Sequence, residues 1–112
     1  EKPIKIDGDG NNEINLVFVQ DVVMVLEKLI NIKTHDTKII DVCGNENFSV
    51  ISLINKINNH YGRQLNIDYN QEDAILPKND FVFDNAQTCI NLDMTFTDFD
   101  KGLKQYMEWY GR

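Results

Sequence analysis

The segment from Gly8 to Val23 constrains this 112-residue chain more than any other, because it joins a glycine turn, a short apolar run and the start of a helical pattern. Two glycines in three residues allow positive φ angles and a close backbone approach. The residues from Leu16 to Val19 are β-branched or apolar, which favours a buried strand. Asp21 is a good N-cap, since its carboxylate can accept from free amides of a first helical turn.

Apolar residues recur at helical spacing after Asp21, and this pattern predicts a helix to about residue 32. Ser49 and Gly62 supply the N-cap and the left-handed stop of a second helix. Asp84 should cap a brief helix to about Ile90. A last helix should follow Thr97–Asp100, which has the outline of a capping box. Its stripe of Phe99, Leu103, Tyr106, Met107 and Tyr110 is typical of a core face.

Short apolar runs between these helices predict strands at 4–6, 38–43, 65–69 and 81–83. The run at 38–43 alternates little between apolar and polar residues, and this favours burial on both faces of a parallel sheet. Its Gly44–Asn47 turn would lie at the carboxyl end of that strand, where open α/β sheets bind ligands. The sequence therefore predicts one α/β domain over residues 1–112, with short parallel strands packed with about three helices.

Composition excludes several classes of function. The formal net charge is −7, so a nucleic-acid backbone or an anionic membrane would repel the chain. No apolar run approaches the ~20 residues of a membrane span. Cys43 and Cys89 lie far apart in the sequence without a Cys-x-x-Cys motif, which fits reduced thiols in a cytoplasmic protein. His35 and His60 have no Cys or His at metal spacing, so no metal ligand is predicted.

Four segments carry a family resemblance in the same order along the chain. They are Gly-Asp-Gly followed by Leu-Val-Phe-Val-Gln-Asp-Val-Val, then residues 39–44, then Ser-Val-x-x-Leu at 49–53, and a last helix that ends in Trp109-Tyr110. Together they resemble the C-terminal, substrate-binding part of extended short-chain dehydrogenases/reductases, the NAD(P)-dependent nucleotide-sugar epimerases, dehydratases and reductases.

This resemblance implies that the chain is a C-terminal fragment of a larger enzyme. The chain begins Glu1-Lys2-Pro3 and enters directly on a strand-like run. It contains no glycine-rich dinucleotide loop and no Tyr-x-x-x-Lys pair, so the catalytic and cofactor-binding residues would belong to an N-terminal Rossmann domain. The fragment alone would hold no cofactor, whereas the parent protein would use NAD or NADP on a nucleotide-sugar. Self-association through an uncovered apolar surface is also expected.

The resemblance further implies that the substrate diphosphate passes near the residues after Gly10 and near the loop after residue 69. Asn12, Asn15 and Asp73 are the polar residues that best match substrate-binding positions. Family members commonly carry an arginine at both places, because a guanidinium can bind two diphosphate oxygens. Here Ile14 and the run 70–73 replace those arginines.

Two alternatives remain open. One is a calcium-binding or protein-interaction module built on the loop from Asp7 to Asn15, since Asp7, Asp9 and Asn11 have the spacing of calcium ligands. Asn12 and Phe18, however, replace the glycine and the closing glutamate of such a loop. The other alternative is a degenerate, non-catalytic homologue.

Overall fold

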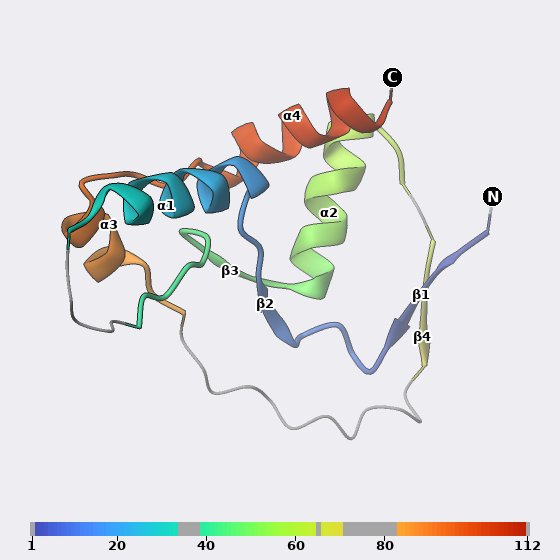
Figure 1. Ribbon diagram of the computed structural model, residues 1–112. Coiled ribbons are helices and arrows are strands. Elements are labelled where there is room, and N and C mark those ends of the chain that lie inside the picture. The colour runs from blue at the N-terminus through green and yellow to red at the C-terminus, as the bar shows by residue number, and fades with distance from the viewer. Residues whose placement is uncertain (1, 34–38, 65, 71–82, 112) are drawn as a thin grey trace. The chain divides into compact units, whose positions relative to one another are not determined.

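The structure is a computed structural model that describes residues 2–33, 39–64, 66–70 and 83–111. Short strands and helices are interspersed along it (Figure 1). In chain order they are β1 (Ile4–Asp7), β2 (Glu13–Asn15), α1 (Val19–Asn31), β3 (Asn47–Ser49), α2 (Val50–Tyr61), β4 (Ile67–Asn70), α3 (Ala86–Leu92) and α4 (Phe99–Tyr110). This arrangement confirms the predicted α/β class with short parallel strands. None of the helices described is long and apolar enough to cross a membrane.

The chain divides into two compact units, and each unit combines two separate stretches of sequence. Unit 1 consists of Glu1–Ile14 and Asn47–Phe81, and unit 2 consists of Asn15–Glu46 and Val82–Arg112. The division therefore does not cut the chain into two consecutive domains. The single domain predicted over residues 1–112 stays a prediction.

Unit 1 contains a parallel strand pair and the helix α2. β1 pairs with β4 in a register that places Ile4 opposite Ile67 and Asp7 opposite Asn70 (Figure 1). This pairing confirms the first predicted strand and most of the third. Among the residues of this unit that the structure describes, the buried apolar side chains are those of Ile6, Phe48 and Ile54.

The ends of α2 agree with the sequence prediction because both signals are local. The hydroxyl of Ser49 accepts from the amide of Ser52 at 3.1 Å. At the other end Gly62 has a φ of 63°, and its amide donates to the carbonyls of Asn58 and Asn59. A residue in this left-handed conformation ends the helix, and glycine adopts the conformation at little steric cost because it has no Cβ atom.

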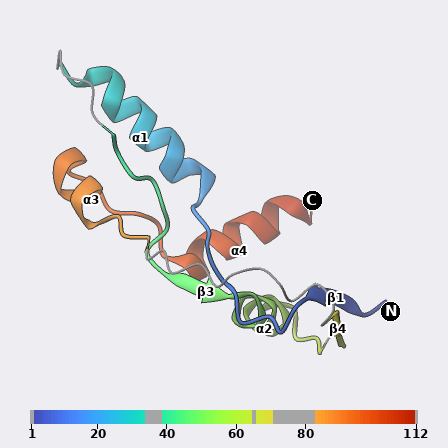
Figure 2. The ribbon, with the colours of Figure 1, turned by 90° about the horizontal axis from the view of Figure 1, so that it is seen from below.

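Unit 2 is built around a separate apolar cluster. Val25 from α1 and Leu92 from α3 pack with Met94 and Phe96, which follow α3 in the chain. Half-buried apolar side chains surround this cluster, namely Val17, Leu29, Ile40, Val42 and Cys89. Figures 1 and 2 both show α1 beside α3, the two helices that supply much of this core.

Asp21 corrects one helix prediction. The helix α1 begins at Val19 with Phe18 as its N-cap, so Asp21 lies inside the first turn and is not the cap. Its buried carboxylate accepts from the Thr97 amide at 2.8 Å and from the Thr97 hydroxyl at 2.7 Å. Thr97 is therefore occupied by Asp21, and α4 starts after Asp98 without a side-chain cap. The predicted capping box at 97–100 is wrong for the same reason.

Three strand predictions also need correction. Residues 16–19 do not form a buried strand, because β2 ends at Asn15 and Leu16 is exposed. Residues 39–43 form no ladder with another described strand, and Ile39 is 96% exposed. Phe83 is exposed and lies in no strand, whereas Phe81 and Val82 fall outside the described residues.

Two predictions in the C-terminal half also differ from the structure. The brief helix begins at Ala86 with Asn85 as its N-cap, although Asp84 still accepts from the Ala86 amide at 2.8 Å. The two tyrosines of the α4 stripe are not core, since Tyr106 is 51% and Tyr110 is 69% exposed, whereas Phe99 is half-buried. The two tyrosine rings stack on each other, with centroids 6.2 Å apart.

The buried carboxylate of Asp21 gives the first testable prediction. Asp21→Ala removes the acceptor of two hydrogen bonds, and bonds to a charged group contribute enough that we expect a loss of about 2–4 kcal/mol in the free energy of unfolding. Urea denaturation followed by circular dichroism measures this loss. Glu27→Ala removes an exposed carboxylate from the same helix and should change it by less than about 0.5 kcal/mol. Equal effects of the two changes would contradict the assignment.

Candidate functional site

The backbone after Gly10 is held against the start of α2. The carbonyls of Gly10 and Asn12 accept from the amides of Ile51 and Val50, each at 3.1 Å. With the Ser49 cap on Ser52, the first three amides of α2 are all occupied. The N-terminus of this helix is therefore closed as an anion site, although free amides at a helix start often bind phosphate.

Gly10 makes this close packing feasible. Its φ is 77°, and a Cβ atom built on it would overlap the side chain of Ile51. The position thus requires glycine for both its conformation and its space. The neighbouring Asn12 side chain is half-buried and forms no hydrogen bond with another described residue. Asn12 therefore keeps an amide that a ligand can use.

Asn15 has a structural role in the described chain. Its side-chain amide donates to the carbonyls of Gly44 at 3.0 Å and Glu46 at 3.2 Å. In return, its side-chain oxygen accepts from the Gly44 amide at 2.6 Å. Three bonds from one side chain hold the turn at 44–46, and they replace the ladder that an adjoining strand would supply.

The turn at Gly44 also allows a very close approach to the chain before α1. A Cβ atom at residue 44 would overlap the carbonyl oxygen of Leu16. On the other side of the turn, Asn85 donates to the Cys43 carbonyl at 3.0 Å and to the side-chain oxygen of Asn45 at 2.9 Å. The Asn45 amide then donates to the Phe96 carbonyl at 3.1 Å. A network of asparagine side chains therefore fixes this turn within unit 2.

The three predicted substrate-binding residues have different positions. Asn12 belongs to unit 1 and Asn15 to unit 2, and Asp73 lies outside the described residues. Asn45 and Asn85 were not predicted. The available signal was the turn at 44–47 after an apolar run, but the pairing of Asn85 with it spans about 40 residues and has no local signature.

The structure also bears on metal binding. The Asp9 carboxylate accepts from the Asn11 amide at 2.9 Å, which is a local turn contact. Among the residues that the structure describes, no group of three or more His, Cys, Asp or Glu side chains gathers to hold a metal ion. The rings of His60 and Tyr61 pack in a T-shaped arrangement with centroids 5.4 Å apart. His35 lies outside the described residues.

The Cys43 thiol is buried next to the turn. Burial raises the pKa of Cys43, and the nearby carboxylates of Asp41 and Asp84 raise it further. Both influences disfavour the thiolate, which is the nucleophilic form. Cys43 is therefore not arranged as a nucleophile.

No protein-family model matches the sequence, and neither does any curated protein. Several solved structures do match the fold. UDP-glucuronic acid 4-epimerase from Bacillus cereus, bound to UDP-glucuronic acid and NAD, has a TM-score of 0.76 at 20% identity over 92% of this chain and 33% of its own. MoeE5 with the same two ligands has a TM-score of 0.78 at 22% identity over 99% and 37%. A GDP-L-fucose synthetase from Naegleria fowleri has 0.67 at 18% over 95% and 32%.

These matches define the fold. The chain has the fold of the C-terminal part of extended short-chain dehydrogenase/reductase structures, as the four sequence segments predicted. It spans about a third of the length of the solved structures that it resembles. Identities near 20% show a common fold, and a common fold hosts many functions.

Gly44 gives a prediction about the turn. Gly44→Ala forces a methyl group onto the Leu16 carbonyl, and such overpacking should lower the free energy of unfolding by at least about 2 kcal/mol. Gly62→Ala is the comparison for space: nothing lies within 4 Å of a Cβ atom at that position, so its cost comes only from its positive φ of 63°, a conformation that Gly44 does not have. It should cost only about 1 kcal/mol. Thermal and urea denaturation compare the two, and a smaller effect at Gly44 would contradict the close approach.

The raised pKa of Cys43 predicts slow alkylation. In the folded protein at neutral pH, iodoacetamide should modify Cys43 at least tenfold more slowly than Cys89, since burial both shields the Cys43 sulfur and lowers its thiolate fraction. Peptide mass spectrometry over a time course measures the two rates. In urea the rates should become similar, and a fast Cys43 in the folded protein would be inconsistent with its burial.

Proposed function

We propose that this chain is the substrate-binding part of an NAD(P)-dependent nucleotide-sugar epimerase, dehydratase or reductase, and that it helps to bind and orient the nucleotide-sugar. The observation that carries the proposal is the fold match over 92–99% of the chain to proteins whose structures hold UDP-sugars and NAD. The order of the four sequence segments supports the same assignment independently of the fold.

The chain's own contribution would be positioning. Orienting a substrate toward a cofactor lowers the activation free energy of the reaction, because the substrate has lost translational and rotational freedom before the reaction begins. Asn12 has an unoccupied side-chain amide beside a backbone fixed by α2, so it can bond a ligand without reorganising its support. The side-chain amide of Asn15, in contrast, already donates to the carbonyls of Gly44 and Glu46, so its role would be to shape the turn. The hydride and proton transfers would belong to residues outside this chain, with NAD(P) accepting and returning the hydride.

The test uses the full-length gene product that contains this chain. We expect it to retain NAD or NADP, measured after acid release, and to bind UDP-glucuronic acid or UDP-glucose in calorimetry. Asn12→Ala should weaken binding of the nucleotide-sugar about tenfold, because a lost hydrogen bond of about 1.4 kcal/mol has that effect. Asn11→Ala changes the adjacent, exposed asparagine and should leave the affinity within about twofold.

The outcomes separate the alternatives. A gene product that binds neither NAD(P) nor a nucleotide-sugar overturns the proposal. If it instead binds Ca²⁺ with a change at Asp9 and Asn11, the loop from Asp7 to Asn15 is a calcium or interaction module. If it binds both ligands without turnover, the protein is a non-catalytic homologue that keeps the substrate site.

A further inference from the structure

The turn before Asn12 contains two Asp-Gly peptide bonds, Asp7-Gly8 and Asp9-Gly10. At such a bond the glycine amide nitrogen can attack Cγ of the preceding protonated carboxyl, since glycine has no Cβ atom to obstruct the approach. A C–N bond forms, a carboxyl C–O bond breaks, and the amide proton leaves with the carboxyl hydroxyl as water. Water then opens the five-membered succinimide at either carbonyl and gives aspartate or isoaspartate. The reaction needs no other reagent.

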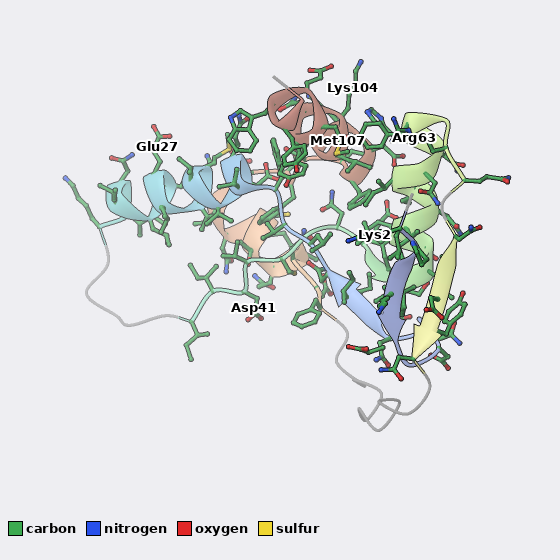
Figure 3. The ribbon with its side chains drawn as sticks, turned by 90° about the vertical axis from the view of Figure 1, so that its right-hand side faces the viewer. Lys2, Glu27, Asp41, Arg63, Lys104 and Met107 are labelled. Atoms are coloured by element: carbon green, nitrogen blue, oxygen red, sulfur yellow. The ribbon has the colours of Figure 1, made fainter. Side chains whose placement is uncertain are left out.

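The Asp7-Gly8 bond is protected by the strand pair of unit 1. Asp7 ends β1, which lies beside β4 in a parallel ladder (Figure 3). The Gly8 amide, which would be the nucleophile, donates to the Asn70 carbonyl at 2.8 Å. Attack on the Asp7 carboxyl would first have to break this hydrogen bond and turn the peptide out of the ladder. The structure therefore opposes ring closure at Asp7.

The Asp9-Gly10 bond lies beyond the end of that ladder. Asp9 is exposed, and its carboxylate accepts from the Asn11 amide at 2.9 Å. Because this hydrogen bond spans Gly10, it folds the carboxylate over the peptide group that contains the Gly10 amide. Within the part of the chain that the structure describes, the Gly10 amide donates to no other group. The carboxyl and the nucleophile are therefore adjacent, and no hydrogen bond of the nucleophile has to open.

An isoaspartate at residue 9 would not fit the packing that follows it. Its main chain runs through Cβ and is longer by one C–C bond, about 1.5 Å. Gly10 has no space to absorb this length, because even a Cβ atom there would overlap Ile51. The Gly10 carbonyl accepts from the Ile51 amide at 3.1 Å. The Asn12 carbonyl accepts from the Val50 amide at the same distance. A displacement of about 1.5 Å is more than a hydrogen bond tolerates.

We propose that Asp9 is a site of spontaneous covalent modification, at which ring closure onto Gly10 forms isoaspartate and releases the turn from the start of α2. Asp7, two residues away and also followed by glycine, resists the reaction because β4 holds the amide of that glycine. The inference does not depend on the proposed function, since the reactants are one carboxyl, one amide and water. It adds a chemical route by which the backbone that supports Asn12 is lost.

Incubation of the full-length gene product in water enriched in the heavy oxygen isotope tests the reaction. Ring closure followed by hydrolysis leaves a heavy oxygen atom at the reacting aspartate, and electron-transfer fragmentation of the peptide locates it. In the folded protein, residue 9 should acquire the label about tenfold faster than residue 7, because the hydrogen bond of the Gly8 amide must open before residue 7 reacts. In urea the two rates should become similar, since both sites are Asp-Gly.

Each labelling result decides the inference. Faster labelling of residue 9 in the folded protein, lost in urea, supports it. Equal labelling of residues 7 and 9 in the folded protein, or faster labelling of residue 7, overturns it. So does the absence of label at residue 9 over a time in which the urea sample is labelled. NAD(P) retention is measured on the same sample, and its loss bears on the proposed function alone.

Asp9→Glu and Asp7→Glu provide a matched pair for the structural consequence. Glutamate keeps the charge but would have to close a six-membered ring, which forms much more slowly. After prolonged storage, the isoaspartate fraction of the unchanged protein and of Asp7→Glu should exchange the Ile51 amide about tenfold faster than Asp9→Glu does. The Ser52 amide, which donates to the Ser49 hydroxyl, is the internal control and should not change. Equal Ile51 exchange in all three stored proteins overturns the release of the turn.

Discussion

Backbone hydrogen bonding is the constraint on which this structure depends, because neither sheet in the described part has more than two strands. A folded chain must still satisfy its half-buried amides and carbonyls. In this structure, side chains form many of the hydrogen bonds to these backbone groups. Asn15 binds Gly44 and Glu46, Asn85 and Thr88 bind the carbonyls of 43 and 41, and Asp21 binds Thr97. The small polar residues are therefore structural in unit 2, and this limits which of them can serve a ligand.

The same constraint explains which predictions succeeded. The bounds of α2 followed from Ser49 and Gly62, because a cap and a left-handed stop act on residues within one turn. β1 and β4 followed from alternation and from their place in the chain. Asp21 was misassigned because its partner, Thr97, is 76 residues away and no local signal connects them. The sequence showed two good capping residues, and the fold uses them to bind each other.

The candidate site was predictable only in part. Glycine spacing and the apolar run after it located the turn and the segment of Asn12, and the fold match confirmed the class of structure to which they belong. The difference in side-chain hydrogen bonding between Asn12 and Asn15 was not predictable, because both are asparagines in one polar stretch. Only the contacts of Asn15 with Gly44 and Glu46 show that its side chain is committed to the chain itself. Asp73, outside the described residues, stays a prediction.

The failed strand prediction at 39–43 contains information of its own. The composition of a segment indicates how far its side chains are buried. Backbone hydrogen bonds of a sheet, however, require a neighbouring strand. The segment has the composition for burial on two faces, and in this chain it has a core on one face and an exposed Ile39 on the other. A buried-strand sequence that pairs with no strand in the described part of the chain is a conflict between local and global structure, which natural proteins seldom keep without a reason. The exposed apolar residues of α1, which are Val19, Val23, Leu26 and Ile30, present the same conflict.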